Sequence, residues 1–157
     1  MKIKLIVIGK TDDAEVQRLI EKYENRLKHY VSFQIEVIPD LKNRKNLSEE
    51  QQKNAEGKLI LEKVQPTDIT ILLDERGKQY SSIGFAQEMQ KHFNSGAKQL
   101  NFIIGGPFGF SQEVYQFTNR KLSLSQMTFS HQMIRCFFVE QIYRAMTILH
   151  NENYHHE

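Results

Sequence analysis

The chain has 157 residues, of which 39% are hydrophobic and 25% are charged. This length and composition are typical of one soluble globular domain, residues 1–157, and they exclude a disordered or fibrous protein. The only cysteine, Cys136, cannot form an intramolecular disulfide, and the apolar N-terminal stretch is too short to cross a bilayer and lacks a cleavage site. We therefore expect a cytoplasmic protein. The net charge of +2 permits a nucleic-acid partner but does not predict one.

The first forty residues predict a strand, a helix and a second strand. Residues 2–8 are mostly apolar, and Asp12 or Asp13 can cap a helix in which apolar residues recur at helical spacing. Apolar residues then alternate over 31–38, before Pro39 ends the strand.

Residues 40–58 are polar, with basic residues clustered between positions 42 and 45. Ser48 and Gln51 fit a capping box at the start of a helix. Because the apolar stripe of this helix is thin and Gly57 interrupts it, we expect a mobile, solvent-exposed excursion. A basic loop that faces RNA is the alternative interpretation.

The second half of the chain predicts three more strands, over 68–74, 101–104 and 121–124. Residues 75–79 predict a charged turn, Ser81 or Ser82 can cap the next helix, and a long helix occupies about 131–150 after a polar loop. Strands that alternate with helices about every thirty residues predict an α/β fold with a mostly parallel sheet and helices on both faces.

A glycine-rich bend follows the strand at 101–104, in the stretch NFIIGGPFGFS at 101–111. Glycines at the carboxyl end of a strand allow backbone N–H groups to approach a ligand closely. A cofactor site is one interpretation, and a tight turn that needs glycine only for its dihedral angles is the other. The dinucleotide and P-loop fingerprints are both absent from the sequence.

The best evidence for a functional site comes from three strand ends, at 73–77, 105–109 and 124–130. The carboxyl ends of parallel strands meet at one edge of a sheet, so these loops are expected to form one pocket.

Six motifs occur in order along nearly the whole chain. They are Leu73-Asp74-x-x-Gly77-Lys78, Ile104-Gly105-Gly106-Pro107-x-Gly109, Leu122-Ser123-Leu124-Ser125-x-Met127-Thr128, His131-x-x-x-Arg135, Glu140-Gln141-x-Tyr143-Arg144-Ala145 and Tyr154-His155. Together they closely resemble the RlmH family, SPOUT-class methyltransferases that modify N3 of a pseudouridine in large-subunit ribosomal RNA.

The resemblance implies a single SPOUT domain with a C-terminal trefoil knot, S-adenosylmethionine as cofactor, no metal, and a homodimer as the active form. Two positions depart from the family pattern: Ser130 replaces a usual proline, and His156 replaces a usual lysine or arginine. The cofactor contacts implied by the resemblance are Leu73, Gly105, Leu124, Ser125, Gln126, Met127, Thr128 and Phe129.

Methyl transfer to a pseudouridine N3 requires loss of the proton that this nitrogen carries, so a general base or a cation is useful. The candidates are His131, Arg135 and His155. His131 could instead cap the helix or contact a dimer partner, and His155 could belong to a disordered tail. The RNA contacts that we expect are Arg144, Tyr154 and His156.

For Arg135, Glu140 and Arg144 the simplest expectation is ion pairing on the last helix. Apolar residues cover more than one side of this helix, which predicts a two-fold interface.

The low net charge favours an assembled ribosomal surface over naked RNA as the substrate. The rival hypothesis is a flavodoxin-like module that binds a nucleotide without methyl transfer. It is weakened because no phosphate-cradling loop follows the first strand.

Overall fold

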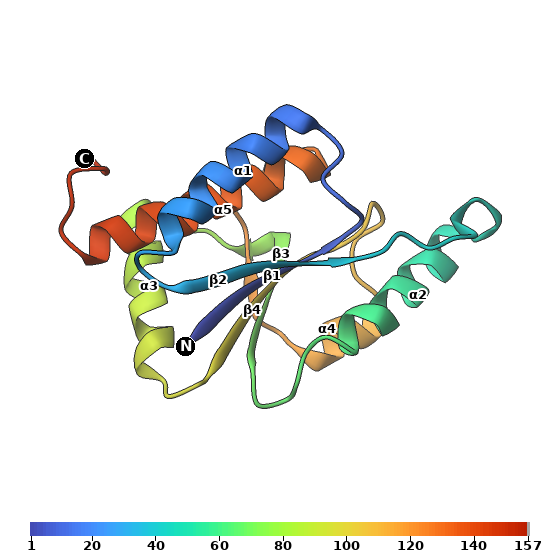
Figure 1. The fold of residues 1–157 in the computed structure, drawn as a ribbon. Helices are drawn as coiled ribbons and strands as arrows, with labels where there is room; N and C mark the ends of the chain where they lie inside the picture. The colour runs from blue at the N-terminus through green and yellow to red at the C-terminus, as the bar shows by residue number, and fades with distance from the viewer. Residues whose placement is uncertain (157) are drawn as a thin grey trace.

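The computed structural model describes residues 1–156, and these form a five-stranded parallel sheet of strand order β2-β1-β4-β3-β5 (Figure 1). Neighbouring strands pair in parallel throughout. The strands are β1 (Lys2–Ile8), β2 (Ser32–Ile38), β3 (Ile69–Lys78), β4 (Gln99–Ile104) and β5 (Lys121–Leu122). The predicted α/β fold with a parallel sheet is therefore confirmed.

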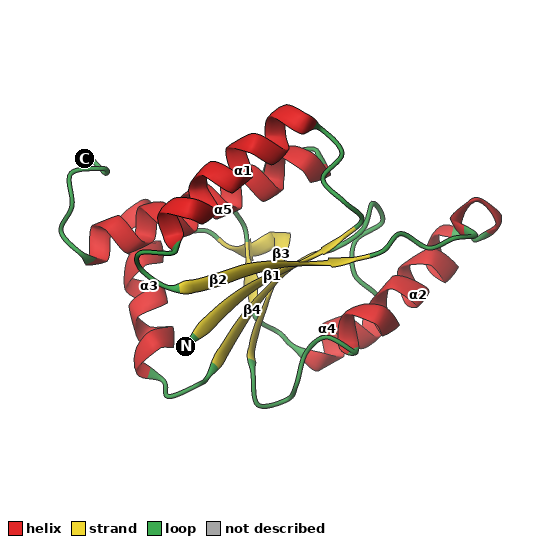
Figure 2. Cartoon of the chain, viewed as in Figure 1, coloured by secondary structure: helices red, strands yellow, loops and turns green. Residues whose placement is uncertain are grey.

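Helices cover both faces of the sheet, as predicted, so the molecule has three layers (Figure 2). One face carries α1 (Ala14–Leu27), α3 (Ser82–Asn94) and α5 (His131–Leu149). The opposite face carries α2 (Glu49–Leu61) and α4 (Gln112–Phe117), and the short helix η1 (Arg44–Asn46) precedes α2.

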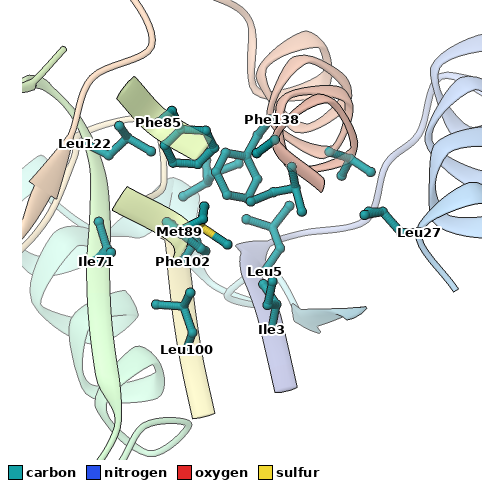
Figure 3. Close-up of a cluster of buried hydrophobic side chains, with 14 of the residues drawn as sticks. Ile3, Leu5, Leu27, Ile71, Phe85, Met89, Leu100, Phe102, Leu122 and Phe138 are labelled. Atoms are coloured by element: carbon teal, nitrogen blue, oxygen red, sulfur yellow. The ribbon is translucent and has the colours of Figure 1, made fainter. Parts of the chain in front are cut away.

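Alternate residues of the central strands enter two separate cores. In β1, Ile3, Leu5 and Val7 pack beneath α1, α3 and α5, whereas Ile6 and Ile8 face α2 and α4. All five are buried, as expected for a strand covered on both faces. Figure 3 shows the larger core, where aromatic rings from β4, α3 and α5 meet the apolar side chains of β1.

Three strand predictions are wrong in their lengths. Strand β4 begins at Gln99 instead of residue 101. β3 continues through residues 75–78, where a charged turn was expected, and Lys78 pairs with Leu122 after an irregularity in the ladder. This extension is mostly exposed, so its charged side chains face solvent while its backbone still finds a partner. Conversely β5 is only two residues long and ends before Ser123, whose N–H still donates to the carbonyl of Lys78 at 3.0 Å and whose hydroxyl donates to the carbonyl of Ser125.

The expectation of a solvent-exposed excursion at 40–58 agrees with residues 40–51, which are exposed or half-buried, but is wrong for the later turns of α2, where Gln52, Glu56 and Gly57 are buried. The capping box of Ser48 and Gln51 is present, but α2 runs beneath the sheet and packs against α4. Gly57 does not interrupt the helix. A Cβ at this position would overlap Ser111, so the glycine permits a close approach of the two elements. The basic residues at 42, 44 and 45 remain exposed, at the far end of this layer.

The last helix begins at His131, as predicted, and Ser130 caps it by accepting a hydrogen bond from the N–H of Met133 at 3.2 Å. A hydroxyl cap thus serves where the family pattern has proline. The C-terminal trefoil knot stays a prediction.

Candidate active site

A cavity of about 570 Å³ lies at the carboxyl ends of β3, β4 and β5. Its walls come from the end of β3, the loop after β4, and the loop between β5 and α5, which confirms that the three strand ends converge on one pocket. A volume of this size is in the range of small-molecule sites. The lining residues used below are Lys53, Leu73, Asp74, Arg76, Gly105, Gly106, Tyr115, Leu124, Ser125, Met127, Thr128, Phe129 and His131.

The structure gathers most of the expected cofactor contacts at this cavity, with Gln126 as the exception. Of the expected reactive residues, His131 lines the cavity and Arg135 and His155 do not. The expected RNA contacts, Arg144, Tyr154 and His156, are likewise not among its walls.

The glycine-rich loop forms one wall of the cavity. Gly109 has a φ of +81°, and its N–H donates to the carbonyl of Gly106 at 3.1 Å, which closes a tight turn. At Gly105 a Cβ would lie 3.2 Å from the ring of Phe110, and at Gly106 it would overlap the carboxyl of Glu56. Side chains are therefore excluded from the middle of this wall, and backbone groups face the cavity.

The loop between β5 and α5 forms the opposite wall. The Ser125 hydroxyl accepts a hydrogen bond from the N–H of Met127 at 3.0 Å, which fixes a turn within the loop. Met127 itself is 76% exposed. The loop thus presents apolar side chains at the mouth of the cavity.

The sequence did not predict a polar network of Asp74, Arg76 and Tyr115 on the cavity wall. The Tyr115 hydroxyl donates to Asp74 at 2.5 Å, and the Arg76 guanidinium donates to the other carboxylate oxygen at 3.2 Å. Despite opposing desolvation, these hydrogen bonds lower the pKa of Asp74, and burial together with the Asp74 carboxylate raises the pKa of Tyr115 to about 12. Asp74 is therefore an anion and Tyr115 a neutral phenol at neutral pH. No sequence spacing could reveal this network, because Tyr115 is 39 residues from Arg76.

His131, in the first turn of α5, lines the cavity. Desolvation of the ring, reinforced by the nearby positive charge of Arg135, lowers the pKa of His131. The imidazole is therefore neutral at neutral pH, which is the form that can accept a proton.

Arg135 does not form the surface ion pair that the sequence suggested. It is 2% exposed, and its guanidinium donates to the carbonyl of Ile8 at 2.7 Å, to the carbonyl of Gly9 at 3.0 Å and to the hydroxyl of Thr11. The long side chain thus ties the start of α5 to the segment that leaves β1. Arg135 is therefore a brace between α5 and the residues that follow β1.

Arg135→Met should lower the free energy of unfolding by about 2–4 kcal/mol, because two buried carbonyl groups would lose their donors. Arg18→Met, at an exposed position of α1, is the matched control and should change it by less than about 0.5 kcal/mol. Urea unfolding followed by circular dichroism measures both. Equal stability of the two variants would contradict a bracing role.

The C-terminal tail is anchored to the end of α5 far from the cavity. Arg144 pairs with Glu140 at 2.7 Å, as the sequence predicted, and the Tyr154 hydroxyl donates to the same carboxylate at 2.9 Å. His155 Nδ1 lies 3.3 Å from the Arg144 guanidinium. In Figure 1 the tail projects beyond the left end of α5, whereas the yellow-orange loop that follows β4 lies to the right.

Neither a metal cluster nor a membrane-spanning helix is found in residues 1–156. No three histidine, cysteine or acidic side chains in this part of the chain gather as metal ligands would. Among the helices that the structure describes, none is both long enough and apolar enough to cross a bilayer.

A parallel sheet with a glycine-walled cavity at its strand ends is consistent with the motif resemblance, and comparison with known proteins gives the class. The family described as "Predicted SPOUT methyltransferase" matches residues 1–155, so the chain belongs to the SPOUT methyltransferase family.

Within this family, the chain is similar to curated proteins named ribosomal RNA large subunit methyltransferase H. It is 60% identical to the protein of Flavobacterium johnsoniae and 55% identical to that of Porphyromonas gingivalis, in each case over the full length of both chains. The protein of Christiangramia forsetii is 60% identical over 99% of each chain. These matches give no support to the rival hypothesis of a flavodoxin-like module.

Proposed function

We propose that this protein transfers a methyl group from S-adenosylmethionine to N3 of a pseudouridine in large-subunit ribosomal RNA, acting on the assembled ribosome in the cytoplasm. The observation that carries the proposal is the glycine-walled cavity in a chain of the SPOUT family. The relatives' names support ribosomal RNA as the substrate.

The cavity fits the cofactor because backbone groups, rather than side chains, form its wall at Gly105 and Gly106. When bound, S-adenosylmethionine supplies a methyl group on a sulfonium, which is electrophilic. The residues that would hold it are Leu73, Gly105, Leu124, Ser125, Gln126, Met127, Thr128 and Phe129.

The residues of this chain contribute mainly by positioning the target nitrogen and by accepting its proton. Holding the target nitrogen in line with the methyl carbon can supply roughly 7–11 kcal/mol of the barrier. The N3–H proton must leave before this nitrogen can attack, and His131 is the neutral base at the cavity that can accept it. The N–C bond formed would replace the bond between the methyl carbon and sulfur, so the leaving group would be the neutral thioether S-adenosylhomocysteine. A nearby cation can stabilise the anionic ring until the bond is complete. His155 and Arg135 are the other candidates for these two roles.

We further propose a homodimer in which the tail of one copy completes the cavity of the other. A 19-residue helix such as α5 is about 28 Å long, so it separates each tail from its own cavity. An apolar surface of Phe129, Met133 and Phe137 is exposed beside the cavity. The ring centroids of Phe129 and Phe137 lie 5.1 Å apart. Such a surface is what a two-fold interface would cover.

The RNA contacts proposed for Arg144, Tyr154 and His156 would then reach the cavity from the partner. The exposed basic residues at 42–45 and the exposed Arg76 at the cavity rim add further contacts. With a net charge of only +2, counterion release on naked RNA is small, which supports recognition of the assembled ribosome.

Incubation of the protein with S-adenosylmethionine carrying a labelled methyl group tests this function. Intact ribosomes that lack the modification should incorporate label into large-subunit RNA, and mass spectrometry of the nucleosides should yield N3-methylpseudouridine. Protein-free ribosomal RNA should react at least about tenfold more slowly. Label in another nucleoside would contradict the substrate, and equal rates on both RNAs would contradict recognition of the ribosome.

A further inference from the structure

Helix α2 contacts the glycine-rich loop near the start of the loop, at Gly106, and at its end, at Ser111. Its consecutive residues Glu56 and Gly57 are buried, the first against Gly106 and the second against Ser111. At either glycine a Cβ would overlap the facing side chain. Ser111 in turn caps α4 by accepting a hydrogen bond from the N–H of Val114. The loop between these two contacts is therefore held against α2.

Glu56 is an unusual residue in this position. It is 3% exposed, and one carboxyl oxygen accepts a hydrogen bond from the Gln52 amide at 2.9 Å. The other oxygen, Oε2, is buried with no hydrogen-bond partner within residues 1–156, and it lies against the backbone of Gly106. Burial raises the pKa of this carboxyl. Since a buried polar group without a partner costs free energy, a residue placed in this way calls for an explanation.

The same face of α2 also reaches the cavity. Lys53, one turn before Glu56, lines it, and its ammonium group pairs with Glu50 at 2.9 Å. Helix α2 is thus the support behind the glycine wall, on the side opposite the loop between β5 and α5.

We propose that Glu56 is a positioning residue for the cofactor site. Its carboxyl occupies the space that a side chain at residue 106 would fill, and so it sets where the Gly105 and Gly106 backbone lies relative to the opposite wall. This inference rests on the proposed cofactor, because it concerns how tightly the glycine wall closes on that ligand.

A double-mutant cycle between Glu56 and Gly106, read by calorimetric titration with S-adenosylmethionine, tests the proposal. Glu56→Ala leaves a void behind the loop and should raise the Kd about tenfold. Gly106→Ala creates the overlap and should raise it about thirtyfold. In the double variant the new methyl group enters the void, so the Kd should return to within about threefold of the wild-type value.

Two further variants test whether the shape of the Glu56 side chain, and not its charge or a general change in α2, sets the Kd. Glu56→Gln keeps the shape of the side chain and should bind within about twofold of the wild-type protein. Asn54→Ala, at an exposed position of α2, is the matched control and should not change the Kd. Should Glu56→Ala fail to fold, Glu56→Asp, which withdraws the carboxyl by one methylene group, takes its place in the cycle.

The outcomes distinguish this inference from the proposed function. A wild-type protein that does not bind S-adenosylmethionine contradicts the cofactor assignment itself. If the wild-type protein binds but Glu56→Ala lowers only the melting temperature, or if the two substitutions act additively, Glu56 merely stabilises α2 and the positioning role is wrong.

Discussion

Gly105→Val is expected to abolish the binding of S-adenosylmethionine, with an increase in Kd of at least about 100-fold. The Cβ of any side chain at this position would lie 3.2 Å from the ring of Phe110, and the two further methyl groups of valine must project into the cavity or displace that ring. Phe110 is 5% exposed and packs in the core beneath α2 and α4, so displacing its ring would disrupt that packing. The substitution therefore fills the site where the backbone should meet the ligand.

Calorimetric titration measures this effect, with ATP, NAD and FMN run beside S-adenosylmethionine. Gly105→Ala should give a smaller increase in Kd, and Ala97→Val, outside the cavity lining, should give none. Thermal unfolding of each variant shows whether lost binding reflects lost folding. Unchanged binding by a folded Gly105→Val protein would place the cofactor elsewhere, and selective binding of FMN or ATP would contradict the methyltransferase cofactor.

The position of this cavity could be predicted from the sequence because each of its walls follows a strand. Apolar runs gave the strands, and the rule that ligands bind at the carboxyl ends of parallel strands gave the site. The glycines at 105, 106 and 109 marked one wall by residue type alone. The order of the strands was beyond such reasoning, since it depends on which pairings bury the most apolar surface across the whole sheet.

The support behind that wall could not be predicted, because helix α2 contradicts the usual patterns. Gln52 and Glu56 are polar but buried, and Gly57 is a poor helix former that here permits close packing. A hydrophobic pattern therefore finds only a weak stripe and predicts exposure. Tertiary contacts with the loop at 105–111 override the local signal, which is a common sign of a functional constraint.

Arg135 and the Asp74 network were missed for a related reason. An arginine on a helix with acidic neighbours normally forms a surface ion pair. Here it is buried and donates to backbone carbonyls more than 120 residues earlier in the chain. Likewise Tyr115 meets Asp74 only because α4 lies beneath the end of β3. Such long-range hydrogen bonds leave no periodic trace in a sequence.

Mixing two inactive variants should restore methyl transfer if each active site takes its cavity from one chain and its tail from the other. Gly105→Val disables the cavity, and a Tyr154→Ala/His155→Ala variant disables the tail. In a mixed dimer one site carries both defects and the other carries neither. Random exchange of subunits makes half of the dimers mixed, so an equimolar mixture should recover about a quarter of the wild-type activity.

The tail variant should leave the cavity of its own chain unchanged. Tyr154 and His155 contact Glu140, Tyr143 and Arg144 at the far end of α5, not the cavity of their own chain. The tail variant alone should therefore bind S-adenosylmethionine within about twofold of the wild-type Kd, while its methyl-transfer rate falls about 100-fold through lost positioning of the RNA. Light scattering at micromolar concentration should give twice the mass of the chain.

Each alternative arrangement gives a different result. A monomeric mass would contradict the dimer, and with it the use of a partner's tail. A dimer whose mixture is no more active than the separate variants would mean that both parts act within one chain, which requires the tail to leave Glu140 and fold back along α5. Weakened cofactor binding in the tail variant would instead show that the tail shapes the cavity itself. Recovery of activity in the mixture, combined with unchanged cofactor binding, is expected only of a site shared between two copies.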